Sequence, residues 1–282
     1  MIGLKRGTVE LYDHQEEWDV EAKNTIQKLK SILGDVIISI DHVGSTSIPT
    51  IKAKPIIDIM IVVKDFDEIL KYENKLQKNG YYYRPGNLAD QLLFASGSFY
   101  EGTGDMQTHF IHVVLENSVS MLTYVNFKNF LIKYPKYAKE YENVKSSLEN
   151  LPRNEYIKGK MDFIQRILRI AQSESYIGKE VYIKIDRPKG STHPKHKNIV
   201  YPVNYGYIEG VIGGDGEELD VYLLGVDEPV TEYKAKVIGV IHRLNDNEDK
   251  LVASPVDKVF TKEQIIEATY FQEQYFESEI FM

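Results

Sequence analysis

The chain has 282 residues, a formal charge of −8 and 43% hydrophobic side chains, enough for about two packed domains at roughly 150 residues each. It has no cysteine, which excludes disulfide frameworks and cysteine-based zinc sites and makes the reducing cytoplasm the expected compartment. The acidic charge disfavours nucleic acid and membrane surfaces as partners, and the sequence has neither a signal peptide nor the ~18 apolar residues of a membrane span.

The first half of the chain alternates short strand-like and helical segments. A strand is predicted at 8–12, and Asp13 is placed to cap a helix over 15–33. β-Branched residues predict a strand at 36–41, and the apolar run at 56–63 predicts a strand buried on both faces. The further expected elements are a helix at 65–78, strands at 80–83, 92–95 and 108–115, and helices from 121 to 171 broken at Pro135 and Pro152. Strands grouped early and helices grouped late indicate an α+β domain.

The pattern of the chain changes after a short polar linker at 172–175. Strand-like runs separated by Gly, Pro and Asp follow at 179–185, 199–208, 218–224, 234–243 and 250–254. One helix is expected, at 261–269. This pattern predicts a small, mainly-β, OB-like barrel. The predicted domains are therefore 1–173 and 174–282.

An acidic segment in the second half is the most informative motif. Asp215, Glu217 and Asp220 could converge where the turn at Gly216 leads into a strand. Hard divalent cations such as Mg²⁺ prefer oxygen ligands, and carboxylates clustered without a metal would repel one another. The alternative interpretation is a solvated acidic hairpin turn.

Three neighbouring segments favour the metal-site interpretation. YPVNYGYI at 201–208 supplies phenol hydroxyls, 186–197 is a basic patch in an acidic protein, and NDNEDK at 245–250 adds carboxylates and a lysine. Together with DGEELDV at 215–221, these segments resemble the soluble inorganic pyrophosphatase family over residues 178–280.

The resemblance implies Mg²⁺-dependent hydrolysis of diphosphate or a related phosphoanhydride. It implies that Asp215, Glu217 and Asp220 ligate the metals or position the attacking water, and that Asp246 and Asp249 complete the metal set. Metal ions lower the pKa of bound water, and Glu217, with Asp220 next, is expected to take its proton. The implied phosphate-binding residues are Tyr205, Lys250 and Tyr275, with Lys189, Lys195 and Lys197 as candidate replacements for a shortened basic hairpin.

Two departures from the family pattern stand out. Glu217 replaces an aspartate, so its carboxylate lies one methylene further out. Phe276 follows Tyr275 where the family has a lysine. These changes bear on the rate and the substrate of the predicted site.

A Gly-Ser turn is the candidate site of the first half. Gly44 and Ser45 lie between two predicted strands, and Asp58 lies on the second strand. Such a turn lets backbone and hydroxyl approach a phosphate, and Asp58 could hold Mg²⁺; an ordinary Ser/Thr turn is the alternative. The longer pattern DHVGSTSIPTIKAKPIIDIMIVV, with VELYDHQEEW, THFIHVVL, FKNFLIKYPKYAKEYENVK and YIKGKMDFI, resembles the GrpB-like family over residues 7–172.

The GrpB-like resemblance implies a nucleotidyltransferase-type fold. It places Gly44, Ser45, Lys54 and Asp58 in a nucleotide site, with Asp58 as its catalytic, metal-binding acid, and His109, His112 and Lys160 at positions that face it. Nucleotidyltransferases use a second acid two residues after the first, where this chain has Met60. Residues three apart on a strand point to opposite faces, so the two histidines are not joint ligands.

The leading functional hypothesis is a diphosphatase domain behind a nucleotidyltransferase or nucleotide-binding domain. Diphosphate and a nucleoside triphosphate are the expected ligands, and hydrolysing diphosphate in the same chain would pull nucleotidyl transfer forward. A second hypothesis is a nucleotide-sensing module that regulates the barrel without transferase chemistry. A third makes both halves scaffolds without catalysis.

Overall fold

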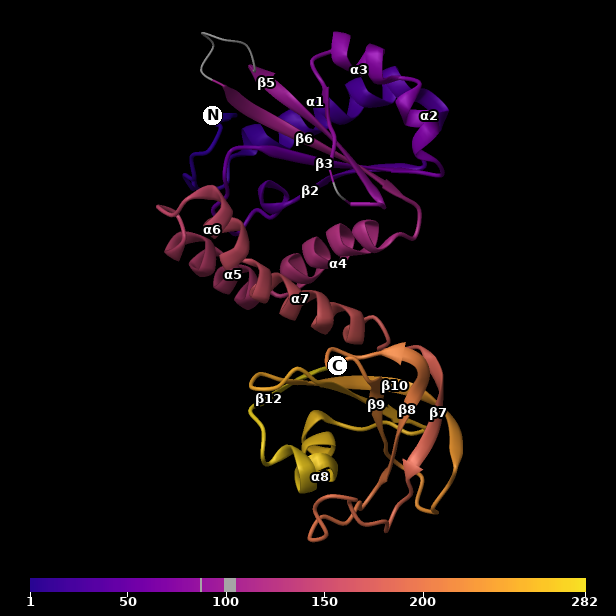
Figure 1. Cartoon of the computed structure of the whole chain (residues 1–282). Helices are drawn as coiled ribbons and strands as arrows, with labels where there is room; N and C mark the ends of the chain where they lie inside the picture. Colours follow the sequence, from indigo (N-terminus) through magenta and orange to yellow (C-terminus); the bar gives the residue numbers. More distant parts are fainter. Residues whose placement is uncertain (87, 99–104) are drawn as a thin grey trace. The chain divides into compact units, whose positions relative to one another are not determined.

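The computed structural model describes residues 1–86, 88–98 and 105–282. The chain divides into two compact units, Met1–Leu168 and Arg169–Met282 (Figure 1). This division falls within helix α7 (Met161–Glu174), close to the boundary predicted after residue 173, which stays a prediction. Within the described ranges no helix combines the length and the apolar character needed to cross a membrane.

The described part of the first unit contains a six-stranded sheet in the order β2-β3-β6-β5-β4, with β1 beside β6. The β3–β6 pair is parallel, and the other pairs are antiparallel. The strands are β1 (Leu4–Lys5), β2 (Ser39–Val43), β3 (Ile57–Val63), β4 (Tyr82–Arg84), β5 (Gln91–Ser98) and β6 (Met106–Leu115).

Helices cover both faces of this sheet (Figure 1). The helices are α1 (Glu16–Leu33), α2 (Phe66–Leu70), α3 (Glu73–Lys78), α4 (Val119–Lys133), α5 (Pro135–Ser147) and α6 (Arg153–Gly159), with 3₁₀ turns at Gly34–Val36 and Ser45–Ser47. Side chains of β3 alternate between the faces, as the strand period requires. Ile57, Ile59 and Ile61 pack in the core that contains α1, whereas Met60 and Val62 pack against α4.

The second unit is a closed five-stranded barrel with an added edge strand. The barrel order is β11-β9-β8-β7-β10, and β10 pairs with β11 to close it. The β9–β11 pair is parallel, and the other pairs are antiparallel. The strands are β7 (Glu180–Arg187), β8 (Asn204–Ile212), β9 (Glu218–Leu223), β10 (Glu232–Arg243), β11 (Asp249–Ser254) and β12 (Ser278–Phe281), which extends β10.

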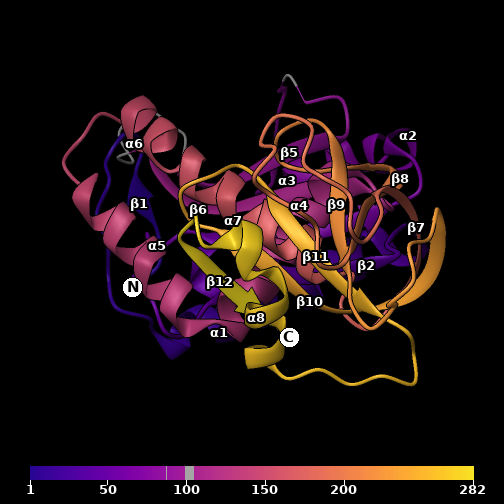
Figure 2. The same cartoon turned by 90° about the horizontal axis from the view of Figure 1, so that it is seen from below.

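Helix α8 (Lys262–Glu273) packs against the barrel core. It starts at a capping box in which Thr261 and Gln264 satisfy each other's backbone N–H groups. Ile265 and Phe271 pack with Tyr201 and Tyr222 of the barrel. Figures 1 and 2 both show α8 next to β12, so the end of the chain folds back onto the barrel.

The predicted α+β and β-barrel classes agree with these two units, but several local predictions were wrong. Residues 8–12 form no ladder, because only Tyr12 pairs, in an isolated bridge with Ala53. Asp13 does not cap α1, which begins at Glu16 after Gln15. The helix predicted at 65–78 is two helices, and β8 begins at Asn204 rather than at 199.

Candidate functional site

A buried lysine is the centre of the candidate site in the barrel. Lys250, on β11, is 2% exposed. Its Nζ donates hydrogen bonds to the Tyr205 hydroxyl at 2.7 Å and to a carboxylate oxygen of Asp220, and it pairs with Glu248 at 2.6 Å. A charge this deep is tolerated because two carboxylates compensate it. We call Lys250, Tyr205, Asp220 and Glu248 the lysine-centred cluster.

The Tyr205 hydroxyl stays protonated in this cluster. Burial, and then the negative charge of Asp220, raise the pKa of Tyr205 well above its usual value. A neutral phenol can accept from Lys250 and donate its own proton to Asp220. Tyr205 therefore holds the lysine and the aspartate in fixed positions.

A buried arginine lies next to the lysine-centred cluster. Arg243, at the end of β10, is also 2% exposed. Its Nη1 donates to Glu248 at 2.8 Å and to Asp246 at 3.1 Å, and its Nε and Nη2 donate to Glu273 at 3.0 and 2.8 Å. The Phe276 ring covers the guanidinium at 3.6 Å from its centroid. Glu248 therefore joins two buried cations, Arg243 and Lys250.

The charge of Arg243 is stabilised by its acidic neighbours. Burial alone would lower the pKa of Arg243, but the hydrogen bonds and the charge of Glu273 outweigh burial and raise it. Tyr222 donates to the same Glu273 carboxylate at 2.6 Å. The guanidinium is thus a permanent positive charge with fixed geometry.

Lys195 and Tyr275, two predicted phosphate-binding residues, share a cavity with this network. The cavity has a volume of about 590 Å³, and Arg243 and Glu248 also line it. Lys197 is exposed and does not line this cavity. Lys189 instead pairs with Asp227 at 2.8 Å. The structure therefore brings together only part of the predicted phosphate-binding set.

The predicted metal ligand Asp249 faces away from the lysine-centred cluster. Its carboxylate accepts from Ser173 at 2.9 Å, bonds His242 Nδ1 at 2.7 Å and lies 3.5 Å from Arg169 Nε. Successive side chains of a strand point to opposite faces, so Asp249 cannot join Lys250 on the same side. Glu248, two residues before Lys250, takes that place, so the structure does not bring Asp249 into the lysine-centred cluster.

The other predicted carboxylates do not assemble into a metal cage. Asp215 and Glu217 lie exposed in the turn before β9, where the Asp215 carboxylate accepts from the Glu217 backbone N–H at 3.1 Å. Asp246 is held by Arg243. Across the described residues, no group of three or more His, Asp or Glu side chains is arranged to hold a metal ion. The assignment of Asp215, Asp220 and Asp246 as metal ligands therefore stays a prediction.

The candidate site of the first unit lies at the Gly-Ser turn between β2 and β3. Gly44 has φ +71°, and a Cβ at this position would lie 2.5 Å from Asp58 Oδ2. Only glycine allows the turn to approach the carboxylate this closely. Asp58 lies on β3, and its Oδ1 bonds His112 Nε2 of β6 at 3.1 Å.

The two histidines of β6 point to opposite faces of the sheet, as predicted. His109 lies near Thr25 and Glu21 of α1, at 3.2 Å from each. His112 contacts Asp58 and lies 2.9 Å from the Tyr124 hydroxyl of α4. No second acid accompanies Asp58 on its strand, because the equivalent position is the buried Met60.

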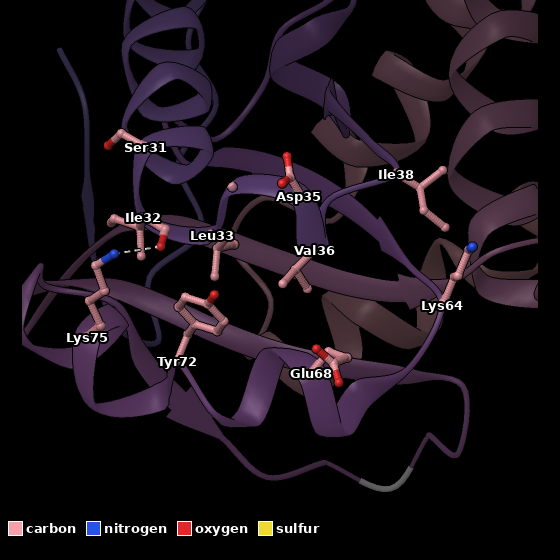
Figure 3. A pocket seen from close by; sticks show the side chains of 11 residues that line it. Ser31, Ile32, Leu33, Asp35, Val36, Ile38, Lys64, Glu68, Tyr72 and Lys75 are labelled. Atoms are coloured by element: carbon pink, nitrogen blue, oxygen red, sulfur yellow. Dashed lines mark hydrogen bonds between the residues drawn. The ribbon is translucent and has the colours of Figure 1, made fainter.

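A cavity of about 600 Å³ lies elsewhere in the first unit, between the end of α1 and helices α2 and α3 (Figure 3). Its polar lining includes Asp35, Lys64 and Glu68, and Lys75 donates to the Ile32 carbonyl oxygen at 2.8 Å. None of the predicted site residues lines it. This cavity is therefore separate from the Gly-Ser turn.

Sequence reasoning missed Glu248, Arg243 and Glu273. A signal existed for Glu248, because residues two apart on a strand share a face, and Glu248 and Lys250 are two apart. Arg243 and Glu273 come from different parts of the chain, so only the fold brings them together.

Comparison with known proteins confirms the predicted resemblance at both ends of the chain. The family model of GrpB protein matches residues 8–169, and that of inorganic pyrophosphatase matches residues 174–278. The glutamate-rich protein GrpB of Alkalihalophilus pseudofirmus is 33% identical over 173 residues, which are 60% of this chain and 98% of the relative. An inorganic pyrophosphatase of Helicobacter pylori is 32% identical over 63 residues, covering 21% of this chain and 36% of the relative.

Among solved structures, a conserved GrpB protein from Enterococcus faecalis superimposes with a TM-score of 0.54 and 26% identity, covering 59% of this chain and 99% of that one. The chain spans less than half the length of the curated pyrophosphatases that it matches, and of two curated UPF0157 relatives. The GrpB model alone covers more than half of the chain. The chain therefore belongs to the GrpB family, and its GrpB unit is followed by an inorganic pyrophosphatase domain at residues 174–278.

Proposed function

We propose that the C-terminal domain hydrolyses inorganic diphosphate, with Mg²⁺ as the cofactor, at the lysine-centred cluster. The observation that carries the proposal is the burial of Lys250 among Tyr205, Asp220 and Glu248 in the segment that matches the pyrophosphatase family. The relatives that match this segment are themselves named inorganic pyrophosphatases.

We assign substrate binding to the cavity of about 590 Å³ that Glu248 lines together with cationic side chains. Lys195 and Arg243 line it, and Tyr275 adds a phenol hydroxyl that can donate to phosphate oxygens. Diphosphate carries several negative charges, and arginine and lysine are suited to bind its oxygens. Lys250 pairs with Glu248 and supplies a further positive charge.

The donor set fits a metal ion that arrives with its substrate. The described residues form no cage for a resident ion, but Mg²⁺ usually takes one or two carboxylates and completes its shell with water and phosphate oxygens. Asp220 and Glu248 are the two carboxylates in position, because both contact the same lysine. When bound there, the ion would neutralise phosphate charge and make bound water more acidic.

Asp220 is the residue that we assign to accept the proton of the attacking water. It is partly open to solvent, with 27% of its side chain exposed, and lies against Lys250. Glu217 is exposed in the turn, where its backbone N–H donates to the Asp215 carboxylate. The geometry therefore favours Asp220 over Glu217 in this role.

Phosphate release from diphosphate by the full chain, with and without Mg²⁺, tests the proposal. Asp220→Asn should lower the rate by about 100-fold or more, as removal of a general base does. Asp257→Asn is the matched control, because Asp257 is exposed on a loop of the same domain. Equal rates for the wild type and Asp220→Asn would refute the assignment.

For the N-terminal domain, the second candidate function is nucleotide binding without nucleotidyl transfer. Asp58 bonds His112, and Met60 occupies the place of a second metal-binding acid. Incubation with labelled nucleoside triphosphates separates the two activities. Saturable binding without transfer of label supports binding, and transfer of label to any acceptor supports nucleotidyl transfer.

A further inference from the structure

Four cationic side chains gather beside the Gly-Ser turn of the first unit. Lys54 precedes β3, Lys145 lies on α5, Arg153 begins α6, and Lys160 follows α6. The positive charges of Lys160 and Arg153 act on Lys54, and those of Lys160 and Lys54 act on Lys145. We call these four residues the basic cluster.

Two tyrosine rings fix the positions of the three lysines. The Nζ atoms of Lys54 and Lys160 each lie 4.7 Å from the centroid of the buried Tyr156 ring. The Nζ of Lys145 lies 4.7 Å from the Tyr141 centroid and donates to the Lys52 carbonyl oxygen. Aromatic faces favour cations, so the rings orient the ammonium groups without neutralising them.

The same tyrosines link the basic cluster to the Gly-Ser turn. Tyr141 forms a side-chain hydrogen bond with Ser45, and burial raises the pKa of Tyr141 to about 12. Asp58, which touches Gly44, exerts its charge on both Lys54 and Lys160. The turn, Asp58 and the cluster therefore belong to one site.

The basic cluster has too few acids to balance it. Asp58 bonds His112, and Glu142 accepts from Lys139 and from the Lys52 backbone N–H. Over the described ranges, no carboxylate forms an ion pair with any of the three lysines.

Two lysines of the basic cluster have pKa values below the ordinary value of lysine. Burial first, and then Lys160, lower the pKa of Lys54 to about 8 and that of Lys145 to about 7. Buried charges without partners are costly, and an anion that entered the site would offset that cost.

We propose that the basic cluster binds a chain of phosphate groups through its lysines, without a divalent metal ion. Lys54 and Lys160 are half-buried and lie on separate segments, so each can meet a different phosphate, whereas the buried Lys145 adds positive charge to the site. Lysine binds phosphate as a compact point charge. Among residues 1–86, 88–98 and 105–282, no other His, Asp or Glu side chains are grouped with Asp58 and His112 to hold a metal ion. This inference deepens the nucleotide-binding role proposed above and is independent of hydrolysis by the barrel.

Calorimetric titration of the full chain with inorganic triphosphate in excess EDTA tests the inference. Wild type should bind, and Lys54→Gln and Lys160→Gln should each weaken binding by about tenfold or more. Lys158→Gln is the matched control, because Lys158 is exposed on α6 and should leave the dissociation constant unchanged. Lys160 is half-buried, so its variant is expected to fold, and a melting curve checks this.

Two further variants show where the triphosphate binds and whether its binding needs a metal ion. A loss of triphosphate binding in EDTA that is confined to Lys250→Gln would move the site to the barrel and overturn the inference. Asp58→Asn removes a repelling charge and should bind at least as tightly. No binding in EDTA, or binding that requires Mg²⁺ and Asp58, would also overturn the inference while leaving nucleotide binding possible. Parallel titration with a nucleoside triphosphate shows whether the natural phosphate chain carries a nucleoside.

Discussion

The two units of this protein bury cations in opposite ways. In the barrel, Lys250 and Arg243 have carboxylates within hydrogen-bonding distance, among them Glu248, which contacts both. In the first unit, Lys54, Lys145 and Lys160 lie against tyrosine rings and have no carboxylate partners within the described part of the chain. The barrel cations are neutralised before any ligand arrives, whereas the basic cluster still lacks a counter-charge.

This difference predicts different requirements for binding phosphate. A phosphate that approaches the barrel meets Asp220 and Glu248 as well as Lys250, so a divalent metal is needed to offset their repulsion. A phosphate that approaches the basic cluster meets mainly positive charge. Replacing a cation by methionine should therefore destabilise the barrel and stabilise the first unit.

Arg243→Met is expected to have the largest effect. It leaves Asp246, Glu248 and Glu273 without their shared partner, and breaking such a buried network costs about 3–5 kcal/mol in the free energy of unfolding. Urea unfolding of the second unit measures the loss. Lys234→Met removes an exposed pair with Glu180 and an exposed contact with the Tyr182 ring, and it should leave stability nearly unchanged. Similar values for both variants would contradict a structural role for Arg243.

Lys250→Met should lower diphosphate hydrolysis by about 100-fold, or about 2.7 kcal/mol in the activation free energy. The substitution also leaves Asp220 and Glu248 facing each other without the cation between them. Mg²⁺ should therefore raise the melting temperature of this variant more than that of the wild type. If Mg²⁺ stabilises both proteins equally, these two carboxylates are not the metal ligands.

Gly44→Ala tests how closely the turn must approach Asp58. The added Cβ would lie 2.5 Å from Asp58 Oδ2 at a φ of +71°, so we expect a loss of about 2 kcal/mol. Gly34→Ala is the matched control, because Gly34 also has a positive φ but open space around its Cβ position. The excess loss at Gly44 measures the clash alone, and equal losses would show that the turn can move away.

Lys145→Met should have the smallest effect and the opposite sign, about 1 kcal/mol of stabilisation at pH 6. The pKa of Lys145 is lowered to about 7 by burial, and also by Lys160 and Lys54, which outweigh Glu142. Below pH 7 the folded protein bears the full cost of the buried charge. From pH 7 towards the ordinary value of 10.5 the folded state loses the proton first, so wild-type stability rises relative to the variant.

Melting temperatures of both proteins from pH 6 to 9 check this prediction. The advantage of Lys145→Met should shrink steadily as the pH rises. An advantage that grows with pH would mean that Lys145 is stabilised in its charged form, and the basic cluster would then need no counter-ion.

The sequence predicted those elements whose own residues determine them. The apolar run of β3 and the period of α1 are intrinsic to their segments, and both elements formed within a few residues of the predicted bounds. Strand 8–12 was wrong, and β1 and β12 were missed, because short strands depend on partners that the local sequence does not reveal.

The residues of the candidate site were likewise predicted only where a local motif identifies them. Lys250, Asp220 and Tyr205 belong to recognisable motifs, and the structure brings them together. Asp249 and Glu248 are adjacent acids, and only the register of β11 determines which one faces Lys250. Lys145 lies on a helix rich in charged residues, where a lysine normally faces water, so its burial follows from tertiary packing alone.

The Phe276 ring against Arg243 gives the barrel an internal spectroscopic reporter. Exposed guanidinium protons exchange with water too fast to be seen at neutral pH, but those of Arg243 are hydrogen-bonded to Glu273 and covered by an aromatic face. Its Nε–H should give a resolved nuclear magnetic resonance signal, displaced by the ring current of Phe276. Because Arg243 and Phe276 both line the cavity, entry of diphosphate can be followed from that one signal, without measuring turnover.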